Sequence, residues 1–94
     1  MAERSFAEFE ASARARGFDE IVERRWAPSL VLETHAHPFA VEALVIDGEM
    51  WLICADDERH LRAGDSFSVP HSVPHSERYG AAGATVWVAR RHAK

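Results

Sequence analysis

The chain contains little cysteine, no long hydrophobic run and no excess of positive charge. Cys54 is its single cysteine, so no disulfide can form within the chain, and this is typical of a reducing compartment. No apolar run approaches the roughly 20 residues that a membrane-spanning helix needs. The N-terminal residues are too polar for a secretory signal. We therefore expect a cytoplasmic protein with no membrane partner.

The charge balance also argues against a nucleic-acid partner. Eleven Lys and Arg residues stand against 15 Asp and Glu residues, for a formal net charge of −4. A nucleic-acid surface needs clustered Lys and Arg side chains. The one such cluster, Arg90, Arg91 and Lys94, is interpreted as a solvated tail. With 94 residues, the chain has room for a single domain.

The N-terminal stretch predicts a short helix over about residues 5–17. Ser5 and Glu8 have the spacing of a capping box, in which each residue satisfies a free backbone N–H of the other. Phe6 and Phe9 lie three residues apart and so share one face of that helix. We expect this face to pack on a sheet, and a partner-binding helix is the alternative.

After Phe18 the apolar residues alternate with polar ones, which predicts strands rather than helices. Turn signals recur every eight to twelve residues, as in a β-sandwich or a barrel. Asp47-Gly48 predicts a two-residue hairpin turn between two of the strands. The expected strands are residues 19–26, 29–37, 40–46, 49–54, 59–62, 66–70, 75–79 and 84–91.

The strands around the expected hairpin are apolar on both faces. The hairpin would place Glu42, Leu44 and Trp51 on one face, and Val45 and other apolar residues on the opposite face. A sheet that is apolar on both faces must be covered on both. One face would line a barrel interior, and we expect the other to lie against a second copy of the chain in a homodimer.

Histidines and a carboxylate gather in the segment HAHPFAVE. His35 and His37 are two residues apart, so on a strand their side chains project from the same face. Glu42 follows on the next expected strand, and His75 comes later in a tight turn. Imidazole and carboxylate groups on adjacent strands make most of a site for a transition metal, rather than for Ca²⁺ or Mg²⁺.

This segment resembles the first motif of the cupin family. That motif runs glycine, five residues, His-x-His, three or four residues, glutamate, six residues, glycine. His35, His37 and Glu42 match it, with four residues between His37 and Glu42. Two departures occur: Ser29 stands at the first glycine, and Gly48 follows Glu42 after five residues rather than six.

The segment GDSFSVPHSVPH is similar to the second cupin motif, which runs glycine, five residues, proline, one residue, glycine, two residues, His, three residues, asparagine. Gly64, Pro70 and His75 match at the expected spacings. Ser72 replaces the second glycine and Tyr79 replaces the asparagine. The whole pattern is similar to the small single-domain, RmlC-like cupins.

The resemblance implies an all-β fold, a double-stranded β-helix or jelly-roll barrel with a short N-terminal helix. A single domain would occupy residues 1–94, with the barrel over about 18–91, and such domains are often homodimers. One divalent transition metal per chain (Fe, Mn, Ni, Zn or Cu) would be held by His35, His37, Glu42 and His75.

The function implied is the binding or transformation of a small molecule at that metal. One hypothesis is a metal-dependent oxygenase, isomerase or lyase, and the alternative is a non-catalytic binding or sensing module with a structural metal. No catalytic residue is assigned. Possible pocket residues are Glu33, Trp51, Phe67, His71 and Tyr79, and the candidate suppliers of a general acid or base are Glu33, His71, Glu77 and Tyr79.

Overall fold

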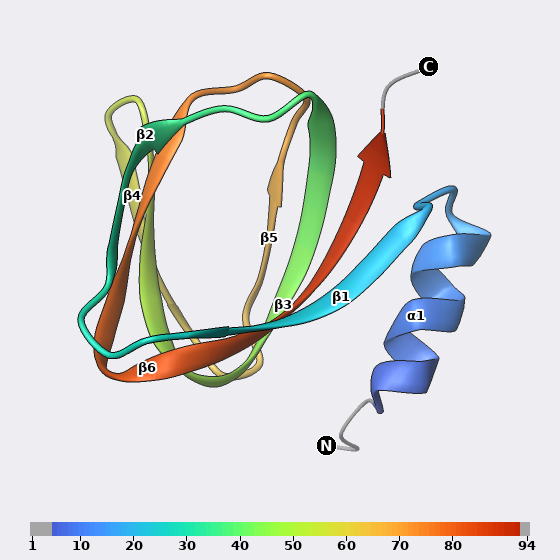
Figure 1. Cartoon of the computed structure of the whole chain (residues 1–94), viewed down its shortest axis with the longest axis horizontal. Helices are drawn as coiled ribbons and strands as arrows, with labels where there is room; N and C mark the ends of the chain where they lie inside the picture. The colour runs from blue at the N-terminus through green and yellow to red at the C-terminus, as the bar shows by residue number, and fades with distance from the viewer. Residues whose placement is uncertain (1–4, 93–94) are drawn as a thin grey trace.

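Two long strands organise the fold of the chain, which a computed structural model describes for residues 5–92 (Figure 1). They are β3 (Phe39–Cys54) and β6 (His75–His92), which run antiparallel beside each other. The other elements are α1 (Phe6–Ala15), β1 (Glu20–Trp26), β2 (Val31–His35), β4 (Asp57–Arg62) and β5 (Ser66–Val69).

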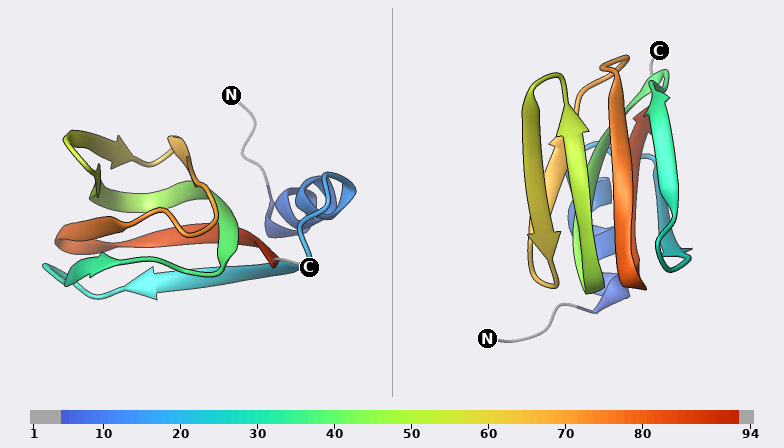
Figure 2. Two further views of the ribbon diagram at one scale, coloured as in Figure 1. Left: turned by 90° about the horizontal axis from the view of Figure 1, so that it is seen from above. Right: turned by 90° about the vertical axis from the view of Figure 1, so that its left-hand side faces the viewer.

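The shorter strands pair with opposite halves of these two long strands. β2 pairs with the beginning of β6 and β1 pairs with its end, while β5 pairs with the first half of β3 and β4 with its second half. Every pairing is antiparallel. Because β3 and β6 bend, the two groups of strands face each other and enclose an interior (Figures 1 and 2). The predicted all-β barrel with a short N-terminal helix is confirmed.

The predicted hairpin at Asp47-Gly48 is wrong, because β3 continues through both residues. The expected two-residue turn would need positive φ at both central positions. Gly48 has φ +78°, but Asp47 is not among the described residues with positive φ. The pairing with β6 shifts register on each side of Gly48, as at a β-bulge. The glycine therefore bends one long strand instead of ending it.

The second glycine turn that we expected, between residues 75–79 and 84–91, is likewise absent, because both stretches belong to β6. Gly83 has φ +74° and lies against Gly48 at the bend. A Cβ atom added to Gly48 would meet the carbonyl oxygen of Gly83 at 2.1 Å. This close approach explains the glycine at position 48, and a Cβ atom added to Gly83 would in turn meet the carbonyl oxygen of Trp26 at 2.4 Å.

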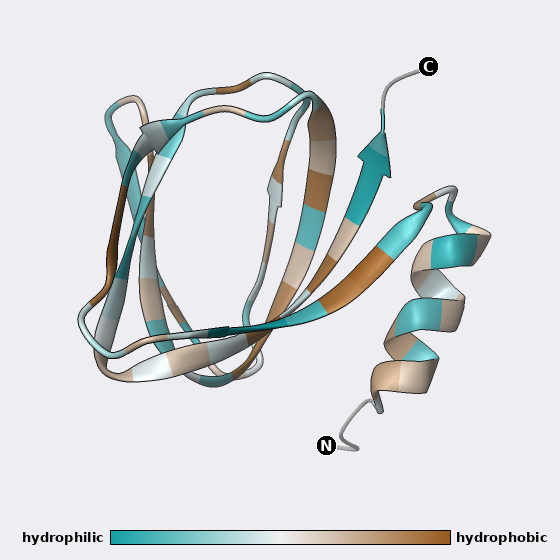
Figure 3. Ribbon diagram, viewed as in Figure 1, coloured by the Kyte–Doolittle hydropathy of each residue, from teal (hydrophilic) through white to brown (hydrophobic). Residues whose placement is uncertain are grey.

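Alternating residues of β3 form much of the barrel interior. Val41, Ala43 and Val45 are buried before the bend, and Met50 and Leu52 are buried after it. These side chains belong to one continuous cluster with residues of β4, β5 and β6. Burial alternates along β3, although most of its residues are apolar, as the predominance of brown and tan along this strand in Figure 3 shows.

Helix α1 packs against the outside of the barrel. The predicted capping box of Ser5 and Glu8 is present. Phe9 packs against Trp87 of β6, with ring centroids 5.8 Å apart, and Leu44 of β3 joins the same cluster. The prediction that the helix lays its phenylalanines on a sheet is therefore confirmed.

The homodimer prediction rests on the outer apolar face of the sheet. Helix α1 of the same chain covers part of that face. The homodimer stays a prediction. Within residues 5–92, no helix is both long enough and apolar enough to cross a membrane.

Candidate metal centre

Three histidines meet inside the barrel. His35 is the last residue of β2 and lies opposite His75, the first residue of β6. His37 follows in the loop that leads to β3. One ring nitrogen from each lies within 4.8 Å of the others. The structure therefore brings together three of the four predicted ligands.

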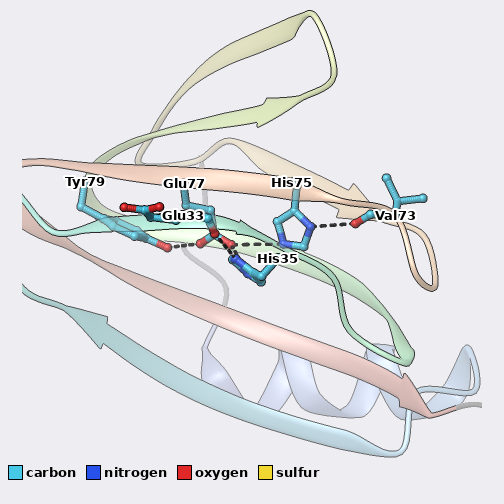
Figure 4. Close-up of polar contacts among 6 residues, drawn as sticks. All are labelled: Glu33, His35, Val73, His75, Glu77 and Tyr79. Carbon is cyan, nitrogen blue, oxygen red and sulfur yellow. Dashed lines mark hydrogen bonds and ion pairs between the residues drawn. The ribbon is translucent and has the colours of Figure 1, made fainter.

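Backbone carbonyl groups set the tautomers of two of these rings. Nδ1 of His35 lies 2.7 Å from the carbonyl oxygen of Glu33, and Nδ1 of His75 lies 3.0 Å from that of Val73 (Figure 4). A carbonyl oxygen can only accept, so each Nδ1 must carry a proton and donate it. In the neutral rings, Nε2 then keeps a free lone pair for a metal ion.

The third ring is held by stacking rather than by a hydrogen bond. His37 lies parallel to the ring of Phe39, with centroids 4.5 Å apart. Its Nδ1 is buried and has no hydrogen-bond partner among the described residues. Burial lowers the pKa of His37, and the neighbouring His75 and His35 lower it further. The ring is thus kept in the neutral form that coordinates metals, and its unpartnered nitrogen fits a site that a metal ion completes.

Glu42 is not brought to this cluster, which corrects the prediction that it is the fourth ligand. Its carboxylate pairs with Arg16, next to α1 on the outside of the barrel. Its neighbours Val41 and Ala43 are the buried ones. The family spacing explains the error, because a gap of six residues before Gly48 puts the glutamate position of the motif at Val41 rather than at Glu42. A one-residue offset along a strand moves a side chain to the opposite face.

The carboxylate that does face the histidines belongs to Glu77. Its Oε2 lies 3.3 Å from Nε2 of His75 and 3.6 Å from Nε2 of His35. The sequence indicated Glu77 only as a possible acid or base. The available signal was the alternation of His75, Glu77 and Tyr79 along one strand, which places all three on the same face (Figure 4).

Tyr79 holds the other oxygen of Glu77. Its hydroxyl donates to Oε1 of Glu77, and its ring stacks on Trp26 with centroids 5.2 Å apart. Burial raises the pKa of Tyr79 well above its ordinary value of 10, and the nearby Glu77 carboxylate raises it further. The phenol therefore stays protonated and acts as a donor.

The cavity around the histidines has a volume of about 240 Å³. Of the predicted pocket residues, Phe67 and Tyr79 line it. The other three predictions are corrected. Trp51 stacks on His60 outside the barrel with centroids 4.5 Å apart, His71 is exposed in a loop, and Glu33 is exposed and contributes only its backbone carbonyl.

Two arginines that neither motif indicated also line the cavity. Arg90 pairs with Glu20 at 3.4 Å. The guanidinium of Arg24 lies over the ring of Trp26 at 4.3 Å and has no acidic partner within residues 5–92. Arg24 therefore contributes to the cavity a positive charge that is not held in an ion pair.

Comparison with known proteins identifies the class of this barrel. The Cupin_2 family model, described as "Cupin domain", matches residues 23–89, so the chain belongs to this family. No curated protein matches the chain.

Solved structures share the fold at low sequence identity. KdgF from Halomonas sp. is 20% identical, with a TM-score of 0.70, and the match covers 79% of this chain and 68% of that one. An RmlC-like cupin from Shewanella frigidimarina NCIMB 400 is 23% identical, with a TM-score of 0.69 and coverages of 83% and 70%.

Oxalate decarboxylase from Bacillus subtilis, whose structure is described for its Mn(II) centres, is 26% identical with a TM-score of 0.70. The match covers 77% of this chain and 20% of that one, so the present chain spans about a fifth of that protein.

Proposed function

We propose that the protein binds one divalent transition metal ion (Fe, Mn, Ni, Zn or Cu) through His35, His37 and His75. The proposal rests on the hydrogen bonding of the three imidazole rings. Two Nε2 lone pairs are freed by backbone acceptors at Nδ1, and the third ring has a buried nitrogen without a partner within residues 5–92. Imidazole ligands favour these metals over Ca²⁺ and Mg²⁺. The Mn(II) centres of the structurally similar oxalate decarboxylase support the proposal.

We further propose that the ligand is a small anionic molecule that offers an oxygen atom to the metal. When bound, such a metal supplies a Lewis acid that polarises that oxygen. Arg24 adds a positive charge to the cavity and would orient the anion. Val41, Phe67 and Val88 line the same cavity and would exclude water from it. A volume of about 240 Å³ admits only a small molecule.

Two activities are compatible with such a centre. The first is a metal-dependent oxygenase, isomerase or lyase. The second is a binding or sensing module without turnover, which is favoured by the lack of a free general base lining the cavity within residues 5–92. The Tyr79 hydroxyl is already donated to Glu77, whose carboxylate faces the histidines.

Elemental analysis of protein purified without chelators or a histidine tag tests the proposed metal binding. We expect about one metal ion per chain in the unchanged protein, and loss of that metal in His37→Ala and His75→Ala. His60→Ala is the matched control, because His60 pairs with Glu49 outside the barrel. Full metal content in both cluster variants would refute the ligand assignment.

A further inference from the structure

The cavity contains one carboxylate among the described residues, that of Glu77. Its side chain is 12% exposed, and the side chain of the adjacent His75 is 2% exposed. The first long strand supplies no carboxylate, because Val41 lines the cavity and Glu42 points outward to Arg16. Any acidic ligand from the described chain must therefore come from Glu77.

The carboxylate faces the same nitrogen atoms that are free to bind a metal. With protons on Nδ1, the Nε2 atoms of neutral His35 and His75 are acceptors, and a carboxylate oxygen is also an acceptor. Acceptors placed 3.3 Å and 3.6 Å apart repel one another unless a metal ion or a shared proton lies between them. Two ligand bonds of about 2.1 Å to one ion can span up to about 4.2 Å, so both separations fit a shared metal.

The rest of the Glu77 side chain is held in this orientation. Tyr79 donates its hydroxyl to Oε1, which leaves Oε2 directed at the histidines (Figure 4). Tyr79 is itself 3% exposed and stacked on Trp26, so the donor is fixed by packing. Second-layer hydrogen bonds of this kind orient metal ligands in proteins.

We propose that Glu77 is the carboxylate ligand that completes the three-histidine centre, and that Tyr79 is the residue that positions it. This inference rests on the proposed metal site. It places the acidic ligand two residues after the last histidine on β6 rather than on β3. The centre then has three neutral ligands and one anionic ligand.

The test is a titration of metal-free protein with Co²⁺, followed by the visible absorption of the bound ion. Glu77→Gln keeps the shape of the side chain but removes its charge, and we expect the dissociation constant to rise about tenfold or more, with a changed Co²⁺ spectrum. Tyr79→Phe should raise the constant by a smaller factor. Glu42→Gln is the matched control on the outer face of β3 and should leave both readouts unchanged.

The outcomes separate the inference from the proposed function. Failure of the unchanged protein to bind Co²⁺ would contradict the metal site and therefore also the inference. Tight binding with the same constant and spectrum in Glu77→Gln would leave the histidine site standing and refute the role of Glu77. If circular dichroism shows that Glu77→Gln is unfolded, Glu77→Asp replaces it. The shorter carboxylate should then weaken Co²⁺ binding, and an unchanged constant would equally refute the inference.

Discussion

Replacing Gly48 with alanine tests the bend that lets β3 pass from one side of the barrel to the other. An alanine Cβ would lie 2.1 Å from the carbonyl oxygen of Gly83 and 2.9 Å from Cα of Ala84. Both atoms belong to the β6 backbone, so no side-chain rotation can relieve the clash. The substitution also places a non-glycine residue at φ +78°.

The expected cost has two parts. A left-handed backbone costs a non-glycine residue roughly 1–2 kcal/mol, and forcing extra atoms into a packed region adds about 1–3 kcal/mol. Gly64→Ala is the matched control, since Gly64 has φ +96° but no atom within 4 Å of an added Cβ. Gly64→Ala should therefore lose only the roughly 1–2 kcal/mol that the left-handed backbone conformation costs. A domain of this size has a total stability of roughly 5–14 kcal/mol, so the difference is measurable.

The assay is urea unfolding of both variants in the presence of a chelator, so that metal binding does not contribute to stability. With a slope of about 1–1.5 kcal/mol per molar urea, the difference of about 1–3 kcal/mol means that Gly48→Ala should unfold at a midpoint about 0.7–3 M lower than Gly64→Ala. Equal midpoints would mean that Gly48 lies in an open turn, as in the hairpin that the sequence suggested, and would refute the bend.

Two further predictions concern the metal and its ligand. Bound metal should be released as the pH falls through about 6, because imidazoles must be neutral to coordinate, and full retention at pH 4 would indicate other ligands. Arg24→Gln should weaken acetate binding to the Co²⁺-loaded protein about two- to fivefold, as followed by the Co²⁺ spectrum. Arg78→Gln, on the outer face over Trp51, is its control, and equal acetate affinity in both variants would remove Arg24 from the ligand site.

Much of the histidine site could be predicted because it depends on short spacings. Strand alternation predicts that His35 and His37 share a face, although His37 lies in the loop after β2, and His75 lies at a fixed spacing from Gly64 and Pro70. Both kinds of spacing survive in the structure, since each ring reaches the same cavity. The capping box of the helix was predictable for the same reason, because both partners lie within one turn.

The carboxylate could not be predicted in this way. Glu42 lies one residue from the position that faces the cavity, and a strand changes face at every residue. A motif match that is offset by one residue along a strand therefore cannot predict which face of the strand the glutamate side chain occupies. Glu77 occupies an unspecified position of the second motif, between His75 and Tyr79, and only its alternation with these two residues indicated where it points.

The continuity of β3 and β6 through their glycines could not be predicted, for a different reason. Gly48 and Gly83 provide the positive φ values that hairpin turns need, but each also allows a neighbouring strand or loop backbone to approach closely. The local sequence does not distinguish a turn from a bulge, because the difference depends on which distant strand lies alongside. The pairing of β3 with β6 is such a distant contact.

The most direct test of the metal centre is a crystal structure of the metal-loaded protein, with diffraction data collected at the absorption edge of the metal. We predict one anomalous peak per chain inside the barrel, within bonding distance of His35, His37 and His75. A peak beside Glu42 on the outer face, or no peak among the three histidines, would contradict the account.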